Sequence, residues 1–152
     1  QHGANECQVV ELADGSLLMN TRVQGQSRGY RGVAVSRDGG ESWEAFREDK
    51  NLPCPTCQAS LVRVPSDQED RLLFSNPVSG DPPGPERGRR VNLTVRLSED
   101  GGKMWSILRK LNEGPAAYSC LTLLSDGSAA CLYEAGVELA YEHLVFERFE
   151  IG

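Results

Sequence analysis

The chain has 152 residues, of which 39% are hydrophobic and 25% are charged, a composition typical of one ordinary globular domain. No apolar run approaches the roughly 20 residues that a transmembrane helix requires, so no membrane span is expected. The formal net charge of −6 argues against a nucleic-acid partner, because such proteins usually present a basic face. An anionic small ligand is still compatible with this charge, since a few convergent arginines reverse the local potential.

Short β-rich segments bounded by turn residues follow one another along the chain, and no long stretch has apolar residues at helical spacing. Asp14-Gly15 and Asp126-Gly127 each separate two such segments and predict β-hairpins. The Pro- and Gly-rich segment 78–90 predicts an exposed loop. The chain is therefore expected to be all-β, with strands at Gln8–Leu12, Leu17–Thr21, Gly32–Ser36, Ser60–Val64, Arg71–Ser75, Val91–Leu97, Leu121–Leu124, Ala129–Tyr133 and His143–Phe149.

One pattern, Ser-x-Asp-x-Gly-x-x-Trp, occurs twice at positions that are 62 residues apart. This Asp-box has a local physical logic. Its Ser and Asp side chains satisfy backbone groups in a turn, Gly permits a positive φ, and Trp packs against the core. We interpret the residues of both copies as structural and not catalytic: Ser36, Asp38, Gly40 and Trp43 in the first, and Ser98, Asp100, Gly102 and Trp105 in the second.

The repeated unit of strands around each Asp-box predicts a four-stranded blade of a β-propeller. One blade is expected from about residue 8 to 47 and a second from about 58 to 111. A third, with only three strands, is expected from residue 119 to the end. About three blades cannot close a ring of the usual four to eight. We therefore expect the chain to be part of a larger propeller.

The five cysteines are odd in number, so they cannot all pair with one another. Cys54-Pro-Thr-Cys57 is a weak signal, because a zinc site needs further ligands nearby and a thioredoxin-like motif needs a βαβ unit. We interpret the cysteines as small core residues or incidental thiols. No metal site and no cofactor is expected.

The two predicted hairpins place polar residues at matching positions. Glu6 and Arg22 lie eight residues before and after Asp14, and Tyr118 and Glu134 lie eight residues before and after Asp126. Antiparallel pairing brings each pair together at the open end of its hairpin. Because propeller blades are related by rotation, both open ends are expected at one face of the molecule. Each residue taken alone would be read as a solvated strand end.

The chain resembles the exo-α-sialidases of bacteria and animals, which are neuraminidases with Asp-box repeats. The resemblance rests on motifs that occur in order through the whole chain: Asn-Glu-Cys-Gln at 5–8, Asn-Thr-Arg at 20–22, Ser-Asn-Pro at 75–77, Arg-Val-Asn-Leu-Thr at 90–94, Gly-Pro-Ala-Ala-Tyr-Ser at 114–119 and Leu-Tyr-Glu at 132–134. It implies a propeller that is six-bladed in the intact family. Residues 1–152 would form the C-terminal portion of that catalytic domain.

The resemblance also implies a role for each polar residue of the two hairpins. Tyr118 corresponds to the catalytic nucleophile and Glu6 to the base that activates its phenol. Arg22 and Arg90 correspond to two of the three arginines that bind the substrate carboxylate, with Arg89 as the competing candidate for the second. Glu134 corresponds to the acid that orients the third arginine. That arginine and the acid/base Asp precede the Asn-Glu-Cys-Gln motif in the family, so the isolated chain is expected to be inactive.

The implied activity is removal of terminal sialic acid from glycoproteins, glycolipids and oligosaccharides, with retention of configuration through a tyrosyl-enzyme intermediate. A tyrosine suits this sugar because a carboxylate nucleophile would be repelled by the carboxylate on the anomeric carbon, whereas a phenol is neutral. Two alternatives remain open: a non-catalytic glycan-binding propeller, and a trans-sialidase, which passes the sugar to another glycan instead of to water.

Overall fold

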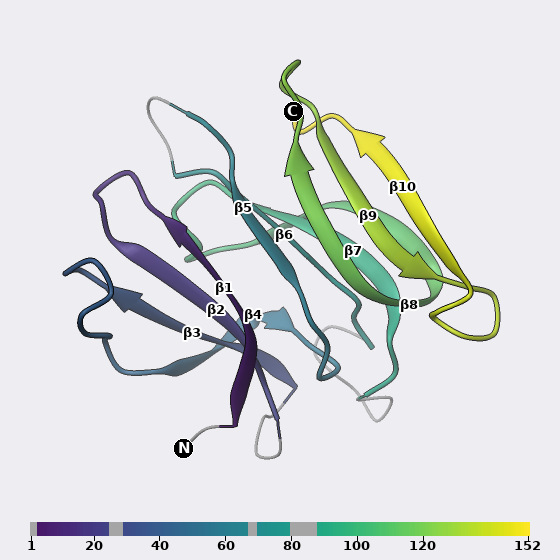
Figure 1. The fold of residues 1–152 in the computed structure, drawn as a ribbon, viewed down its shortest axis with the longest axis horizontal. Coiled ribbons are helices and arrows are strands. Elements are labelled where there is room, and N and C mark those ends of the chain that lie inside the picture. The colour runs from purple at the N-terminus through teal and green to yellow at the C-terminus, as the bar shows by residue number, and fades with distance from the viewer. Residues whose placement is uncertain (1–2, 25–28, 67–69, 80–87) are drawn as a thin grey trace.

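The computed structural model describes residues 3–24, 29–66, 70–79 and 88–152, and all regular structure within those ranges is antiparallel β-sheet (Figure 1). The first sheet has the strand order β1-β2-β3-β4, with bounds Ala4–Glu11, Leu17–Val23, Tyr30–Ser36 and Arg47–Pro53. The second has the order β10-β9-β8-β7-β6-β5. Its strands, from β5 to β10, are Ser60–Arg63, Leu72–Asn76, Val91–Ser98, Ser106–Leu123, Ala129–Ala135 and His143–Phe149.

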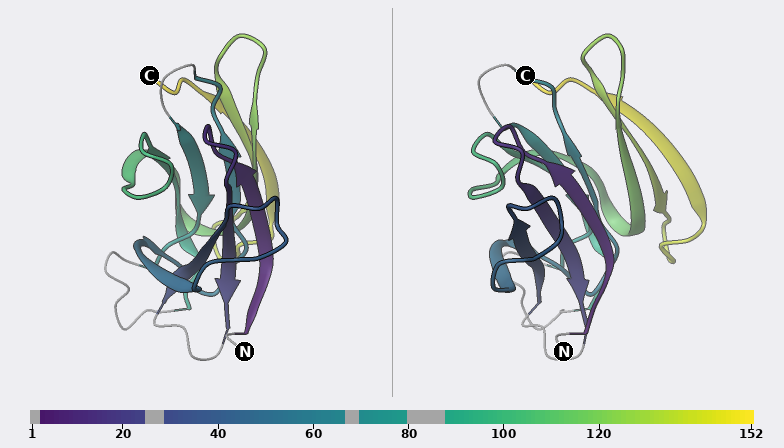
Figure 2. Two further views of the ribbon diagram at one scale, coloured as in Figure 1. Left: turned by 90° about the vertical axis from the view of Figure 1, so that its left-hand side faces the viewer. Right: turned by 60° about the vertical axis from the view of Figure 1, so that its left-hand side comes forward.

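The long strand β8 belongs to two successive blades. Its first part, from Ser106 to Pro115, pairs with β7, and its second part, from Ala116 to Leu123, pairs with β9. The second blade is therefore β5 to the start of β8, and the third is the rest of β8 with β9 and β10. The all-β propeller architecture, with about three blades and a three-stranded third, is confirmed. Figure 2 shows from two further sides how the twisted sheets follow one another.

Both predicted hairpins are confirmed, since β1 pairs with β2 across Asp14-Gly15 and β8 pairs with β9 across Asp126-Gly127. Strand β4 was not predicted, because its sequence Arg-Glu-Asp-Lys-Asn-Leu-Pro has none of the β-branched residues that favour strands. As an edge strand it tolerates these charges. Blade one consequently extends beyond the predicted 8–47. Most of the predicted loop 78–90 lies outside the described residues, which leave out 80–87.

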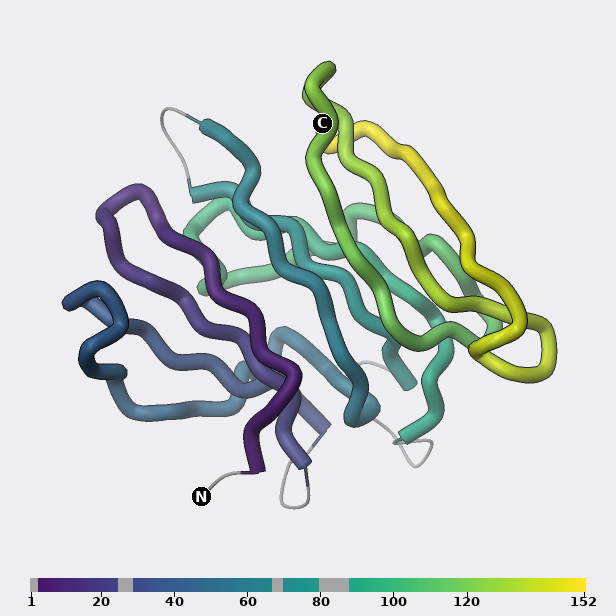
Figure 3. The backbone as a smooth tube through the Cα atoms, in the orientation of Figure 1, coloured from purple at the N-terminus to yellow at the C-terminus, as the bar shows by residue number. Residues whose placement is uncertain are grey.

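The inner strand of each blade neighbours the inner strand of the next, as the tube in Figure 3 shows for β1, β5 and the second part of β8. Side chains connect these strands. Gln8 Oε1 accepts a hydrogen bond from the backbone N–H of Leu61 at 2.8 Å, and Ser60 Oγ accepts one from the N–H of Leu121 at 2.9 Å. These bonds fix the relative position of the strand ends that form the site described below.

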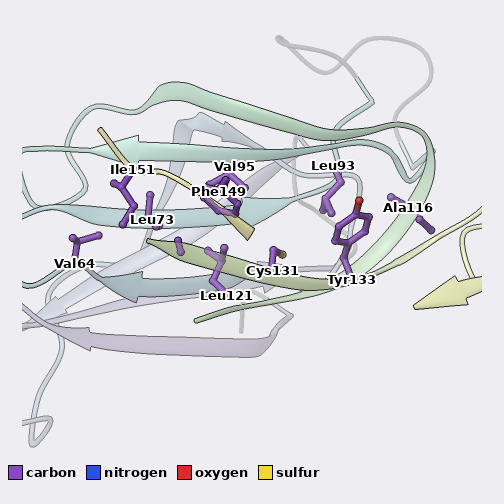
Figure 4. Packing of buried hydrophobic residues seen from close by; sticks show 12 residues of the cluster. Val64, Leu73, Leu93, Val95, Ala116, Leu121, Cys131, Tyr133, Phe149 and Ile151 are labelled. Atoms are coloured by element: carbon purple, nitrogen blue, oxygen red, sulfur yellow. The ribbon is translucent and has the colours of Figure 1, made fainter. Parts of the chain in front are cut away.

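Apolar side chains fill the space between successive blades. Between blades one and two lie Leu18, Val33, Leu52, Ala59, Leu61, Leu72 and Phe74. Between blades two and three lies a larger cluster, shown in Figure 4, which includes Val64, Leu73, Leu93, Val95, Leu121, Cys131, Tyr133, Phe149 and Ile151. Burial of such side chains contributes roughly 25 cal/mol per Å² of apolar surface. The blades therefore form one body that holds the inner strands in register.

The first Asp-box forms the turn that its sequence predicts. Asp38 Oδ1 accepts hydrogen bonds from Ser36 Oγ at 2.8 Å and from the N–H of Ser42 at 2.9 Å, while Ser36 Oγ accepts one from the N–H of Gly40 at 2.9 Å. The Ser42 hydroxyl also donates to Asp38 Oδ2, and this bond is the largest cause of the lowered pKa of Asp38, which is about 2. Every acceptor bond of this carboxylate is local, which fits a structural role.

The second Asp-box repeats the arrangement with Ser98, Asp100 and Gly102. The two tryptophans differ. Trp105 packs between blades one and two, with its ring centroid 5.7 Å from that of Phe74. Trp43 is 39% exposed, so the expectation that it fills the core is wrong for this chain. Because the two Asp-boxes are copies of one motif, Trp43 lies on the face of blade one that is equivalent to the face of blade two bearing Trp105. No blade among the described residues packs against that face of blade one.

Both Asp-boxes follow the C-terminal ends of β3 and β7, whereas the open ends of the two hairpins lie at the other end of the strands. The described N- and C-terminal ends of the chain likewise lie at opposite ends of the blades (Figure 1). Among the described residues, no helix is long and apolar enough to cross a membrane.

Candidate active site

Two β-bulges shape the open ends of the hairpins. In the first hairpin Asn5 pairs with Arg22 and Gln8 with Asn20, so that residues 6 and 7 face one residue of β2. In the second, the register shifts between Ala116 and Ser119, so that residues 117 and 118 face one residue of β9. A bulge bends its strand and turns a side chain out of the regular alternation. Glu6 and Tyr118 are the residues so displaced, and both point to one place.

Tyr118 and Glu6 come from different blades and meet there. The Tyr118 hydroxyl donates a hydrogen bond of 2.5 Å to Glu6 Oε1, a length typical of an O–H donor to a charged oxygen. This bond, followed by burial and the charge of Glu6, raises the pKa of Tyr118 above its ordinary value. At neutral pH the phenol therefore keeps its proton, and a proton acceptor is already in contact with it.

Arg22 lies on the other side of Glu6. Its Nη1 is 2.9 Å from Glu6 Oε2, an ion pair by distance although the two groups are not aligned as a hydrogen bond. Its Nε donates to Asn5 Oδ1 at 2.8 Å. The Arg22 side chain is only 11% exposed. It is therefore held at a fixed place beside the carboxylate.

Arg90 covers the ring of Tyr118. Its guanidinium carbon lies 5.7 Å from the ring centroid, within the range of a cation–π contact. Its Nη1 donates to the Tyr141 hydroxyl at 2.9 Å and its Nη2 to the carbonyl of Thr56 at 3.1 Å. Arg89, the competing candidate, is exposed. A groove of about 360 Å³ runs beside Arg90 and is lined in part by Tyr141.

Glu134 and Gln58 hold the backbone around Tyr118. Glu134 Oε2 accepts a hydrogen bond from the N–H of Tyr118 at 3.0 Å, so the pairing predicted from the second hairpin is present. Gln58 makes two bonds of 3.0 Å to Ser119, one to its N–H and one to its carbonyl. Cys120, which follows, is exposed. An open cavity of about 260 Å³ lies along Tyr118, Glu134 and Gln58.

Three residues other than glycine have a positive φ in the described ranges, and all three belong to this region: Glu6 at 43°, Thr56 at 56° and Asn92 at 54°. Such a conformation costs of the order of 1–3 kcal/mol and persists only where the surroundings enforce it. Thr56 supplies the carbonyl that holds Arg90, and Asn92 follows Arg90 at a register shift in β7. The strain is therefore concentrated in the segments that hold Glu6 and Arg90 beside Tyr118.

The five residues of the predicted site are brought together: Glu6, Arg22, Arg90, Tyr118 and Glu134. Neither Asp-box is part of this region. Sequence reasoning missed Thr56, Gln58 and Tyr141, because their contacts depend on loops from other blades. A second cavity, of about 570 Å³, lies at the opposite end beside the Asp126-Gly127 turn and contains none of the predicted residues.

Comparison with known proteins agrees with this arrangement. Residues 1–131 match the model of the BNR repeat-like domain family. A sialidase of Micromonospora viridifaciens is 39% identical over 145 residues, which are 91% of this chain and 21% of the relative. A Hadza microbial sialidase is similar in structure, with a TM-score of 0.78, 34% identity, and coverage of 98% of this chain and 28% of the other.

A trans-sialidase is also similar. The intramolecular trans-sialidase from Ruminococcus gnavus, solved with oseltamivir carboxylate, gives a TM-score of 0.70 and 27% identity over 97% of this chain and 32% of that protein. The chain thus spans about a fifth to a third of the length of these proteins. The family match, the curated relatives and the two Asp-boxes agree: the chain belongs to the BNR repeat-like domain family and is the counterpart of a β-propeller segment of the sialidases.

Proposed function

We propose that this chain is the C-terminal portion of the catalytic propeller of an exo-α-sialidase, which hydrolyses terminal sialic acid from glycoproteins, glycolipids or oligosaccharides with retention. The observation that supports this most strongly is the 2.5 Å hydrogen bond from Tyr118 to Glu6, with Arg22 and Arg90 beside it. Two arginines next to a neutral phenol suit a sugar that carries a carboxylate on its anomeric carbon.

In the first step Tyr118 Oη attacks the anomeric carbon, and Glu6 Oε1 accepts the phenol proton as the new C–O bond forms. The bond to the leaving glycan breaks at the same time, and that oxygen takes a proton from an acid. The sialidase resemblance assigns this acid to an Asp that lies upstream of the present residues. In the second step water attacks the anomeric carbon and gives a proton to the conjugate base of that upstream acid, while Tyr118 leaves with the proton returned from Glu6. Two inversions give net retention.

Arg22 and Arg90 bind the substrate carboxylate in this proposal. A guanidinium donates two parallel hydrogen bonds to a carboxylate and does not lose its charge at physiological pH. Arg90 is already oriented by Tyr141 and Thr56, so little side-chain freedom is lost when substrate binds. The family's third arginine, which Glu134 would orient, also belongs to the upstream part.

The test is Tyr118→Phe in the intact protein that contains this segment, assayed with a fluorogenic sialoside. We expect turnover to fall by at least about a thousandfold, because the nucleophile is removed, while the circular dichroism spectrum is unchanged. Near-normal turnover would remove Tyr118 from the mechanism. We expect the 152-residue chain alone to show no turnover, because it lacks the acid, whose contribution is typically 10²–10⁴-fold.

The second candidate function is a trans-sialidase, and the likeness to the Ruminococcus gnavus enzyme is the observation in its favour. Both activities use the same first step and differ in the group that accepts the sugar. Product analysis separates the two activities. A hydrolase releases free sialic acid, whereas a trans-sialidase transfers sialic acid to a hydroxyl group of the same sugar or to a second glycan. A non-catalytic glycan-binding propeller is disfavoured, since binding alone has no use for a carboxylate in contact with a phenol.

A further inference from the structure

Arg31, which none of the assigned roles includes, is fully buried beneath the site at the start of β3. Its guanidinium donates to three different segments. Nε donates to Asn20 Oδ1 on β2 at 2.7 Å, and Nη1 donates to the carbonyl of Cys57 at 2.7 Å. Nη2 donates to the carbonyl of Glu6 at 3.4 Å. One side chain thus touches both the strand that bears Glu6 and the turn at 54–57.

The turn at 54–57 is the Cys-Pro-Thr-Cys segment of the sequence, and its packing explains those residues. The Cys54 thiol accepts hydrogen bonds from Arg31 Nη1 at 3.8 Å and from the N–H of Cys57 at 3.5 Å. Both thiols are buried and free, and burial is the main reason that the pKa of Cys57 is raised to about 12. Cys57 therefore acts as a neutral packing group, and Cys54 closes the turn around the guanidinium through its sulfur.

The two contacts of Arg31 that matter for the site are at a strained residue, Glu6, and directly after another, Thr56. It donates to the carbonyl of Glu6, whose φ is 43°, and it fixes the turn in which Thr56 has a φ of 56°. The Thr56 carbonyl in turn holds Arg90. A strained backbone needs such enforcement from its surroundings. Arg31 provides it for the base and for one carboxylate-binding arginine at once.

Burial of an arginine in a protein core costs free energy, because its charge loses contact with water. Its hydrogen-bond acceptors among the described residues are an amide oxygen, two backbone carbonyls and a thiol. Burial lowers the pKa of Arg31, and the nearby thiols and the charge of Glu6 offset this desolvation only in part. An apolar side chain of similar size would be the less costly filler at such a place. A guanidinium reaches three acceptors in fixed directions, which neither an apolar chain nor a lysine reproduces.

We propose that Arg31 is a positioning residue of the sialidase reaction: its buried guanidinium sets the backbone of Glu6 and the 54–57 turn, and through them the proton acceptor of Tyr118 and the orientation of Arg90. This inference rests on the proposed function. It predicts that loss of the guanidinium fork lowers turnover more than it weakens substrate binding. The Glu6–Tyr118 geometry matters only for the chemical step, whereas Arg90 keeps its hydrogen bond to the Tyr141 hydroxyl.

The experiment compares Arg31→Lys with Arg96→Lys in the intact protein. Arg96 is the matched control, because it is also a buried arginine on a third strand and donates to an asparagine, Asn76, at 3.4 Å. We expect kcat for a fluorogenic sialoside to fall about tenfold or more in Arg31→Lys, with KM changed less than about threefold. Arg96→Lys should lower the melting temperature to a similar extent and leave kcat within about threefold of wild type.

A second variant keeps the test decisive if Arg31→Lys does not fold. Asn20→Ala leaves the guanidinium in place but removes the acceptor of its Nε, and it should lower kcat in the same direction by a smaller factor. Asn76→Ala is its control. Folded Arg31→Lys or Asn20→Ala protein with wild-type kcat would overturn the positioning role. An inactive wild-type protein would instead reject the proposed function, and this inference with it.

Discussion

At the Asp-box turns the positive φ angles belong to glycines, for example 72° at Gly39 and 73° at Gly101. At the opposite ends of the same blades, where Gly29 and Gly88 also have a positive φ, three residues other than glycine share this conformation: Glu6, Thr56 and Asn92. Glycine adopts this conformation without steric cost, whereas the other three residues do not. The turns are thus relaxed, and the site is strained.

The carboxylates at the two ends differ in the same way. Asp38 and Asp100 accept all their bonds from their own turns. Glu6 instead contacts Tyr118, which is 112 residues away in sequence, and Arg22 on the next strand. A carboxylate whose hydrogen bonds all come from its own turn forms a structural unit that can be repeated in every blade. Long-range contacts that stay strained are typical of a site at which the fold is used for chemistry.

The largest effect expected from this comparison is at Glu6. Glu6→Gln keeps the size of the side chain but removes the proton acceptor of Tyr118. We expect turnover by the intact protein to fall about 10²–10⁴-fold, the usual contribution of general base catalysis. The hydrogen bond to the Glu6 carboxylate, and to a lesser degree its charge, raises the pKa of Tyr118, so that pKa should fall in the variant, as followed by ultraviolet absorbance against Tyr118→Phe. Asp38→Asn, the matched change at the relaxed end, should leave turnover unchanged.

The next largest effect is expected on ligand affinity at Arg90. Arg90→Lys keeps the positive charge but loses the guanidinium that can donate two parallel hydrogen bonds. A hydrogen bond to a charged group contributes about 1.5–3 kcal/mol, so affinity for an unsaturated sialic-acid analogue should fall tenfold or more, at about 1.4 kcal/mol per decade. Calorimetric titration of the intact protein measures it. Arg89→Lys is the control and should change affinity little. A larger loss at Arg89 than at Arg90 would contradict the assignment of the clamp.

Changes in backbone strain should have a smaller effect, on the stability of the fold, and the effect should have opposite signs at the site and at the Asp-box turn. Thr56→Gly should raise the midpoint of urea unfolding, because relief of a positive φ is worth of the order of 1 kcal/mol. Gly39→Ala should lower it by a similar amount, since an added Cβ at Gly39 meets no atom within 4 Å and only the φ of 72° opposes it. A destabilised Thr56→Gly protein would mean that this end is not strained.

The smallest effect is the pH dependence of the first Asp-box. The pKa of folded Asp38, about 2, lies below the ordinary 3.8, so its ionised form adds stability that is fully present above about pH 4 and is lost as the pH falls through about 2. Asp38→Asn should therefore lower the urea midpoint at pH 7 and approach wild type near pH 2. The exposed neighbour Glu41, changed to Gln, is the control. An equal difference at both pH values would contradict the role of the ionised carboxylate.

The same contrast explains how much of the molecule the sequence predicts. The Asp-boxes and the two Asp-Gly hairpins were predicted because their signals are local and repeated. The site residues were predicted from hairpin symmetry and family resemblance, yet the bulges at Glu6 and Tyr118 were not, since a bulge leaves no local signal here. Strand β4 was missed because an edge strand needs no apolar pattern. Arg31 was missed because its partners come from three separate segments.

We propose Tyr118 as the nucleophile of a retaining sialidase reaction. The direct measurement is to incubate the intact protein with a fluorinated sialosyl fluoride, which slows breakdown of a covalent intermediate, and to locate the adduct by peptide mass spectrometry. We expect one sialosyl group on the peptide that contains Tyr118, and none in Tyr118→Phe. An adduct on Glu6 or Glu134, or inactivation without any adduct on Tyr118, would contradict it.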